Sequence, residues 1–381
     1  MTKRLLDYCR SHQPWMLELV ETLAAIESPT DDKAAVDRCG VTLAARLEQM
    51  GGAVQRVAST SAGDHLVTRF GSGARQVLLL GHFDTVWPMG TLARMPLVAK
   101  DGFLHGPGVL DMKAGLALGM LATRAVLEEG PLGDIGITML WTTDEETGSH
   151  TSRALIETEA ARSDAVLVLE PALAGGALKT SRKGCGQYEL KVRGVSAHAG
   201  VDPRKGVNAI RELAHQVLAV DAIRDLDRGI SVNVGVISGG SRPNVVPDFA
   251  TATVDVRAQT MLDADSVDQA MRSLRAVTPG AHLEVTGDFN RPPMERSEGV
   301  IRLFGVAKAV AADMGFELHE GGTGGGSDGN FTAALGIPTL DGLGAIGDGA
   351  HALHEHVELA SLPARAALIA GLLNRLTRAA D

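Results

Sequence analysis

Ile135 to Gly148 reads Ile-Gly-Ile-Thr-Met-Leu-Trp-Thr-Thr-Asp-Glu-Glu-Thr-Gly, an apolar run followed by three consecutive acids. A short continuous apolar run that ends in turn-forming residues is typical of a buried β-strand, and it lacks the spacing of a charged helix face. Asp144, Glu145 and Glu146 are therefore expected on the loop that leaves this strand. Adjacent carboxylates on a short loop repel one another unless cations or hydrogen-bond donors lie nearby. We expect the rest of the chain to bring positive charge to this loop.

Two further apolar runs, at 76–80 and 165–169, also read as buried strands. His82 and Asp84 follow the first of these strands, and Glu170 follows the second. Asp111 opens an Ala/Leu-rich helix that runs to about residue 129. In open α/β sheets, ligands bind beyond the carboxyl ends of the strands. Strands and helices alternate along this part of the chain, so we predict an α/β domain with a mostly parallel, helix-covered sheet.

From about residue 179 the order of predicted elements changes. Strands and helices follow in the order βαββαβ, at 187–192, 207–220, 231–237, 249–256, 264–277 and 282–286. This is the order of the ferredoxin-like unit, one antiparallel sheet with two helices on a face. Arg291-Pro292-Pro293 then returns the chain to the first pattern. We predict an inserted α+β domain over 179–290 between two parts of the α/β domain, 1–178 and 291–381.

The composition limits the class of protein. With 45% hydrophobic and 22% charged residues, the chain has the composition of a folded globular protein. Charges interrupt the N-terminal residues where a signal peptide needs an apolar core, and no apolar run can span a bilayer, so we expect a cytoplasmic protein. A net charge of -10 argues against nucleic acid or a membrane as partner. Cys9, Cys39 and Cys185 suggest neither a disulfide framework nor a thiolate zinc site.

Each polar residue has an ordinary structural explanation when taken alone. Asp111 stands where a helix N-cap is common, and a His-x-Asp pair such as His82 and Asp84 is more often a cap or a surface pair. The set as a whole, with Glu170, the acidic loop and a late histidine, indicates more, because a parallel sheet gathers such residues at one edge. Imidazole and carboxylate ligands without thiolates are typical of catalytic zinc, manganese or cobalt sites. A bridging carboxylate would support two ions roughly 3.5–4 Å apart.

Four motifs together resemble the dinuclear zinc peptidase and deacylase family. They are His82-Phe83-Asp84-Thr85-Val86, Gly106-Pro107-Gly108-Val109-Leu110-Asp111-Met112-Lys113-Ala114-Gly115, Asp144-Glu145-Glu146-Thr147-Gly148 and Ser196-Ala197-His198-Ala199-Gly200. The family includes glutamate carboxypeptidase, aminoacylase, acetylornithine deacetylase, succinyl-diaminopimelate desuccinylase and tripeptide aminopeptidase. The resemblance extends in order over nearly the whole chain, including the inserted domain.

The resemblance implies two divalent metal ions, with zinc favoured over cobalt or manganese, and five ligands. His82 would bind one ion, and Asp111 would bridge the two. Glu146 would bind one ion, Glu170 would complete the shell of the other, and His351 would close the set.

The late ligand is selected by its spacing. In the family it precedes a glutamate by four positions, which favours His351, four residues before Glu355, over the alternative His354. His354 and His356 are then expected at the surface. Asp84, two residues after His82, would hold that histidine from behind.

Two residues carry the chemistry that the resemblance implies. Glu145 matches the general base. It would take a proton from the metal-bridging water, which becomes the attacking hydroxide, and would later protonate the leaving amine. His198 matches a histidine of the inserted domain that polarises the scissile carbonyl, often in the partner subunit. The resemblance therefore implies a homodimer joined through the inserted domain.

Substrate binding is expected to depend on a free carboxylate. Arg257 is placed like the family's carboxylate-binding arginine, and Asn244 resembles a substrate contact, although it is also ordinary turn chemistry. Ser327 lies in the Gly-rich run 321–329, whose backbone N–H groups could bind the same carboxylate, although glycine flexibility would also explain the run.

The favoured activity is that of a carboxypeptidase that releases C-terminal glutamate, or a similar residue, from N-acyl or folate-like conjugates. The segments 84–92 and 324–329 most resemble the glutamate carboxypeptidase branch. One alternative is an N-acyl-amino-acid deacylase or an amidohydrolase on another small conjugate. A more remote one is a metal-binding protein without catalysis.

Overall fold

The structure, a computed structural model, describes residues 2–378 and divides the chain into two compact units. Unit 1 comprises Met1–Ser181, Arg296–Gly322 and Ser327–Asp381, and unit 2 comprises Arg182–Glu295 and Thr323–Gly326. Within residues 2–378, every helix is too short or too polar to cross a membrane.

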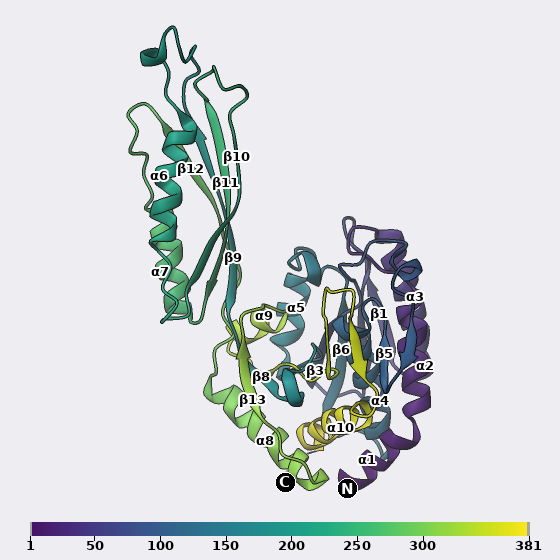
Figure 1. Cartoon of the computed structure of the whole chain (residues 1–381). Helices are drawn as coiled ribbons and strands as arrows, with labels where there is room; N and C mark the ends of the chain where they lie inside the picture. Colours follow the sequence, from purple (N-terminus) through teal and green to yellow (C-terminus); the bar gives the residue numbers. More distant parts are fainter. Residues whose placement is uncertain (1, 379–381) are drawn as a thin grey trace. The chain divides into compact units, whose positions relative to one another are not determined.

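Unit 1 contains a six-stranded sheet in the order β1-β2-β6-β3-β7-β14. Figure 1 labels its strands β1, β6 and β3. The strands β6, β3, β7 and β14 are parallel, whereas β1 and β2 are antiparallel to their neighbours. The bounds are β1 Ala53–Val57, β2 His65–Phe70, β3 Arg75–His82, β6 Ile135–Thr142, β7 Ser163–Val168 and β14 Thr339–Leu340.

The central strands are apolar on both faces because both faces are covered by helices. Val77 and Leu79 of β3 belong to a core with the helices α4 (Ala114–Glu128) and α10 (Leu362–Arg378). Leu78 and Leu80, which point the other way, pack with residues of α5 (Arg153–Ala160) and α9 (Gly329–Ala334). A continuous apolar run is the sequence pattern of such a doubly covered strand.

The remaining helices of unit 1 surround this sheet (Figure 1). They are α1 Thr2–Ser11, α2 Gln13–Ala24, α3 Lys33–Gln49 and α8 Glu298–Met314. Asp32 caps α3, because its carboxylate accepts a hydrogen bond from Ala35 N at 3.0 Å.

Two further small sheets have strands of two to five residues. One has the order β15-β16-β5-β4, and the other joins β13 to β8. Their bounds are β4 Val98–Lys100, β5 Phe103–His105, β8 Leu178–Arg182, β13 Glu320–Thr323, β15 Gly347–Asp348 and β16 His356–Glu358.

Unit 2 contains a four-stranded antiparallel sheet in the order β10-β11-β9-β12. Chain order is β9 Gly184–Arg193, α6 Ala209–Asp221, β10 Ser231–Gly239, β11 Phe249–Ala258, α7 Met261–Arg272 and β12 His282–Arg291. Residues of α6 and α7 share one core with alternate sheet residues such as Leu190 and Val254. The predicted fold class, a helix-covered, parallel-rich sheet with a ferredoxin-like α+β part, is confirmed.

Candidate metal and hydrolytic site

The candidate residues of unit 1 lie beyond the carboxyl ends of three parallel strands. His82 ends β3, and in the ladder it is the partner of Thr142, the last residue of β6. Glu145 and Glu146 follow β6 on the short 3₁₀ turn η3 (Glu145–Thr147). Glu170 follows β7, which pairs with the other side of β3. The order of the strands therefore places all four side chains at one edge of the sheet.

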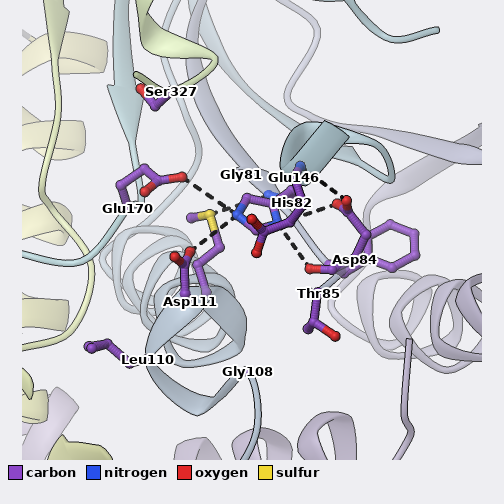
Figure 2. Close-up of polar contacts among 12 residues, drawn as sticks. Gly81, His82, Asp84, Thr85, Gly108, Leu110, Asp111, Glu146, Glu170 and Ser327 are labelled. Atoms are coloured by element: carbon purple, nitrogen blue, oxygen red, sulfur yellow. Dashed lines mark hydrogen bonds and ion pairs between the residues drawn. The ribbon is translucent and has the colours of Figure 1, made fainter. Parts of the chain in front are cut away.

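Asp111 reaches the same place from an irregular turn before α4. The residue has φ −114° and ψ 93°, which is not helical, and the N-cap of α4 is Lys113. The alternative explanation of Asp111 as a helix cap is therefore wrong. Its Oδ1 lies 3.3 Å from Nε2 of His82, and Oε1 of Glu170 lies 3.5 Å from the same nitrogen (Figure 2).

The second oxygen of Asp111 faces a different histidine. Nε2 of His351 lies 3.3 Å from Asp111 Oδ2 and 3.1 Å from Glu146 Oε2. His351 has φ 61° and lies in the connection between β15 and β16. Because β16 pairs with β5, which leads into the Asp111 turn, the small sheet carries His351 to this point.

His354 and His356 point to other surroundings. His354 is exposed, and its backbone oxygen lies 2.8 Å from Nδ1 of His356. The His356 ring is half-buried against Phe103, with centroids 5.0 Å apart, and His105, at 5.1 Å. The exposed His354 fits the expectation of a surface position, and His356 is partly exposed.

The donor atoms fit a divalent cation. Several are buried without a partner in hydrogen-bonding geometry among residues 2–378, namely His82 Nε2, Asp84 Oδ1, Asp111 Oδ1 and Glu146 Oε1. Ligand atoms of His82, Asp111 and Glu146 lie within 4.8 Å of one another, and so do those of His82, Glu145 and Glu170. Buried polar atoms without partners are costly, and bound cations would satisfy those of His82, Asp111 and Glu146. Asp84 Oδ1 instead faces Nδ1 of His82. Imidazole nitrogen and carboxylate oxygen are suitable ligands for zinc.

The electrostatics of this set are those of carboxylates that need positive charge. Burial opposes protonation of His82, but the carboxylates of Asp111, Asp84 and Glu170 outweigh it and raise the pKa of His82 well above its usual range. Asp111 and Glu146 raise the pKa of His351 to about 10. Burial raises the pKa of Glu146. The surrounding carboxylates therefore favour the protonated form of both histidines.

Asp84 contacts two of the candidate ligands, His82 and Glu146. Its Oδ1 lies 3.3 Å from Nδ1 of His82, and its backbone oxygen lies 3.0 Å from the same nitrogen. Its Oδ2 accepts a hydrogen bond from Thr30 Oγ1 at 2.8 Å. The same oxygen accepts from Glu146 N at 3.3 Å (Figure 2). A donor bond from Nδ1 leaves Nε2 of His82 as the nitrogen that faces the candidate ligands.

In unit 2, His198 and Asn244 lie on neighbouring loops. Ala199 N donates to Asn244 O at 3.0 Å, and Val246 N donates to Ala197 O at 2.9 Å. Nδ1 of His198 accepts from the N–H groups of Gly200 and Val201, both at 3.2 Å. Neutral imidazole has one acceptor and one donor, so these bonds place the proton of neutral His198 on Nε2. The exposed His198 side chain is thus a hydrogen-bond donor.

Arg257 of unit 2 is already paired with acceptors. Its Nε and Nη2 donate to the two oxygens of Asp255 at 2.9 and 2.7 Å, and Nη1 lies 2.6 Å from Cys185 Sγ. The role of Arg257 in binding a substrate carboxylate stays a prediction, and it would require the guanidinium to be shared or exchanged.

Ser327 is fully buried in unit 1, near Glu170 in Figure 2. Its hydroxyl donates to Asp341 Oδ2 at 2.6 Å and accepts from Gly329 N at 3.1 Å, while its backbone N–H donates to Asn330 Oδ1 at 2.9 Å. These bonds occupy the groups that a substrate would need, so its predicted substrate contact has no support from this geometry.

Comparison with known proteins gives the family. Residues 78–375 match the model of peptidase family M20/M25/M40. The chain belongs to this family. The resemblance inferred from the four motifs is thereby confirmed, and so is the prediction of an enzyme, a metal-dependent hydrolase of amide bonds.

The proteins that are similar to this M20/M25/M40 peptidase carry the names of different activities. Carboxypeptidase G2 of Pseudomonas sp. (strain RS-16) is 34% identical over 97% of this chain and 91% of its own length. A succinyl-diaminopimelate desuccinylase of Stenotrophomonas maltophilia (strain K279a) is 30% identical over 95% of this chain and 99% of its own. A dinuclear metal binding M20 peptidase of Bacillus subtilis shares the fold, with a TM-score of 0.72, 13% identity and coverage of 97% and 100%.

For three acids near this site, Asp144, Asp328 and Glu355, we predicted no role of their own from the sequence. Asp144 accepts from Thr151 N at 2.6 Å and from the hydroxyls of Thr151 and Ser152. Asp328 accepts from the hydroxyls of Thr142 and Ser149. In the sequence analysis, Glu355 was used only to choose His351 as the late ligand. Its four-residue spacing from that histidine was the sequence signal that pointed to Glu355 itself.

Proposed function

We propose that Asp111 would be a ligand shared by two divalent cations. His82 and Glu170 would complete the ligands of one ion, and Glu146 and His351 those of the other. The observation that carries this proposal is that the two oxygens of Asp111 face two different histidines, each at 3.3 Å. When bound, the cations would lower the pKa of a coordinated water molecule and polarise the substrate carbonyl. Zinc is favoured by the ligand types, with cobalt or manganese as alternatives.

Glu145 is the proposed general base. One of its carboxylate oxygens lies within 4.8 Å of ligand atoms of His82 and Glu170, close enough to serve a water molecule held there. It takes the proton from the attacking water and later returns it to the leaving amine. Glu146, one residue along the same turn, faces His351 instead. The two adjacent acids would therefore divide proton transfer and metal binding between them.

His198 is the proposed donor to the developing oxyanion. Its Nδ1 bonds to Gly200 N and Val201 N support this role, because they leave Nε2–H as the available donor. Asn244, on the neighbouring loop, is the proposed companion contact to the substrate.

The proposed homodimer would form through unit 2. β10 is an edge strand of the four-stranded sheet, and its Val236 and Ile237 are 61% and 58% exposed. Exposed apolar residues on a sheet edge favour pairing with another chain. We propose accordingly that unit 1 is the catalytic part and unit 2 the dimerisation part.

The proposed substrate is a small amide with a free carboxylate, and the proposed activity is release of C-terminal glutamate from an N-acyl or folate-like conjugate. The carboxypeptidase named among the relatives supports this choice. Arg257 is the proposed carboxylate ligand, with Ser327 as a further predicted contact. Cytoplasmic location is part of the proposal. The cysteines support it, because Cys9, Cys39 and Cys185 are free thiols, as expected in a reducing compartment.

An N-acyl-amino-acid deacylase is the alternative, and the desuccinylase relative supports it. The two activities differ in which product carries the recognised carboxylate.

A panel of N-acyl-glutamate, N-acyl-aspartate, dipeptide, N-acetyl and N-succinyl amino acid substrates tests the proposal. We expect N-acyl-glutamate to give the highest kcat/KM with zinc, cobalt or manganese. Glu145→Gln should lower kcat by about 10²–10⁴-fold while metal content stays that of the wild type, because a base is lost and a ligand is not. Hydrolysis confined to N-succinyl substrates would favour the deacylase. If no substrate of the panel were hydrolysed, the result would favour a metal-binding protein without catalysis.

A further inference from the structure

Asp111 and His351 come from distant parts of the chain, yet in the proposed site their side chains would bind the same ion. Two features join the segments that carry them. The first is the pairing of β16 with β5, in which His356 is opposite His105. The second is the side chain of Glu355, which follows the His351 turn and is fully buried.

Glu355 binds the turn that presents Asp111. Its Oε1 accepts from Leu110 N at 2.9 Å and from Asp111 N at 3.1 Å. Its Oε2 accepts from Gly108 N at 2.9 Å and from Trp87 Nε1 at 2.8 Å. The backbone oxygen of Glu355 also accepts from Gly106 N at 3.2 Å. One residue therefore receives five N–H groups, four of them from the segment 106–111.

The geometry requires a carboxylate in particular. All four bonds to the side chain of Glu355 come from N–H donors, two on each oxygen, so both oxygens must accept. A glutamine of the same shape would turn an NH₂ group toward two of these donors. Donor would then face donor inside the protein, where an unsatisfied polar group is costly. The Asp111 turn would have to move relative to the His351 turn.

We propose that Glu355 is a positioning residue that fixes Asp111 and His351 relative to each other for the ion that they share with Glu146. The inference rests on the proposed metal ligands. The other ion depends less on Glu355, because only Asp111 among its three proposed ligands belongs to the segment that Glu355 holds. Loss of the Glu355 carboxylate should therefore weaken the two ions unequally.

Zinc binding to the metal-free chain tests this asymmetry directly, by equilibrium dialysis with a competing chelator. Two parent variants each keep one proposed site: His82→Ala keeps the site of Asp111, Glu146 and His351, and His351→Ala keeps the other. Adding Glu355→Gln should raise the zinc Kd of the first parent by about 10–100-fold, the usual effect of removing a residue that orients a ligand. In the second parent the rise should be clearly smaller. Activity is not needed as a readout.

Glu212→Gln is the matched control. Glu212 is also fully buried, and its carboxylate accepts from the backbone N–H groups of Val277 and Thr278 in unit 2. Its replacement should leave both zinc Kd values unchanged. If Glu212→Gln weakened zinc as much as Glu355→Gln, a general loss of stability would explain both effects, and the inference would be overturned.

The remaining outcomes are equally distinct. Equal weakening in both parents, or none, overturns the role of Glu355. If Glu355→Gln does not fold, Trp87→Phe decides, because it removes one donor and leaves three. It should raise the zinc Kd of the His82→Ala parent by about two- to tenfold, the usual worth of one hydrogen bond, and an unchanged Kd would overturn the inference. A wild-type chain that binds fewer than two zinc ions would overturn the proposed metal site as well.

Discussion

Asp111 concentrates the electrostatics of the site in one side chain. Burial opposes its ionisation, but His351 and His82, one beside each oxygen, hold its pKa below the usual range. The same contacts keep protons on both histidines. A cation that binds here must displace those protons, since only neutral imidazole is a metal ligand. Metal uptake and proton release are therefore coupled.

The coupling predicts how metal binding depends on pH. The pKa of His351 is raised to about 10 and that of His82 is raised well above its usual range, so we expect both to be protonated at pH 7 in the metal-free chain. Uptake of two ions at pH 7 should release about two protons, and the apparent affinity should rise with pH as the protons become easier to displace. Calorimetric titration with zinc in buffers of different ionisation enthalpy measures the number released. His351→Ala should release about one fewer, and a binding enthalpy that is the same in every buffer would contradict the coupling.

At the scale of single residues, the sequence indicated which residues could bind metal better than it indicated the hydrogen-bond partners of other candidate residues. The five proposed ligands could be chosen because each follows a strand, opens a helix or stands in a recognisable motif. The sequence did not show that Arg257 is paired with Asp255, or that the Ser327 hydroxyl is bonded to Asp341. Such contacts depend on how side chains fill a particular turn or interior, and residue spacing carries no information about that.

At the scale of elements, the acidic loop is held by its own neighbours. Asp144 ties the start of the loop to Thr151 and Ser152, just before α5, through three hydrogen bonds to a buried carboxylate. Glu145 and Glu146 lie between these two points. The loop is therefore closed on itself and presents both acids on a fixed turn.

Removal of that tie should destabilise unit 1. We expect Asp144→Ala to lower the free energy of unfolding by about 2–4 kcal/mol, because it leaves buried donors without an acceptor. Asp7→Ala, which removes an acid that is 75% exposed on α1, should change stability by less than about 0.5 kcal/mol. Urea unfolding measures both. An Asp144→Ala chain as stable as the Asp7→Ala chain would show that the loop does not depend on this carboxylate.

The elements that the sequence predicted best are those with strong patterns. β3, β6 and β7 are continuous apolar runs because helices cover both faces, and α4 and α10 are long and apolar on the side that faces the sheet. The small sheet β15-β16-β5-β4 was not predicted, because strands of two or three residues have no measurable periodicity. That sheet nevertheless brings His351 to Asp111, so the sequence alone could assign this ligand only by resemblance.

At the scale of the whole molecule, the proposed homodimer depends on the β10 edge of unit 2. Val236→Lys together with Ile237→Lys should convert a dimer to a monomer, because two charges on the edge strand oppose pairing. Leu262→Lys is the matched control, since Leu262 is 76% exposed but belongs to helix α7 and not to the edge strand. Light scattering after size exclusion gives the mass of each variant. An unchanged dimer in the double variant would place the interface elsewhere.

In the proposed function of this M20/M25/M40 chain, residues at the strand ends form a two-ion hydrolytic centre together with His351. The most direct measurement is glutamate release from an N-acyl-glutamate by the metal-free chain as zinc is added in known equivalents. We predict no release without zinc and a plateau close to two equivalents, with His82→Ala and His351→Ala far below the wild type at every zinc level. Full release by the metal-free chain, or a plateau at one equivalent with His351→Ala unaffected, would contradict the account.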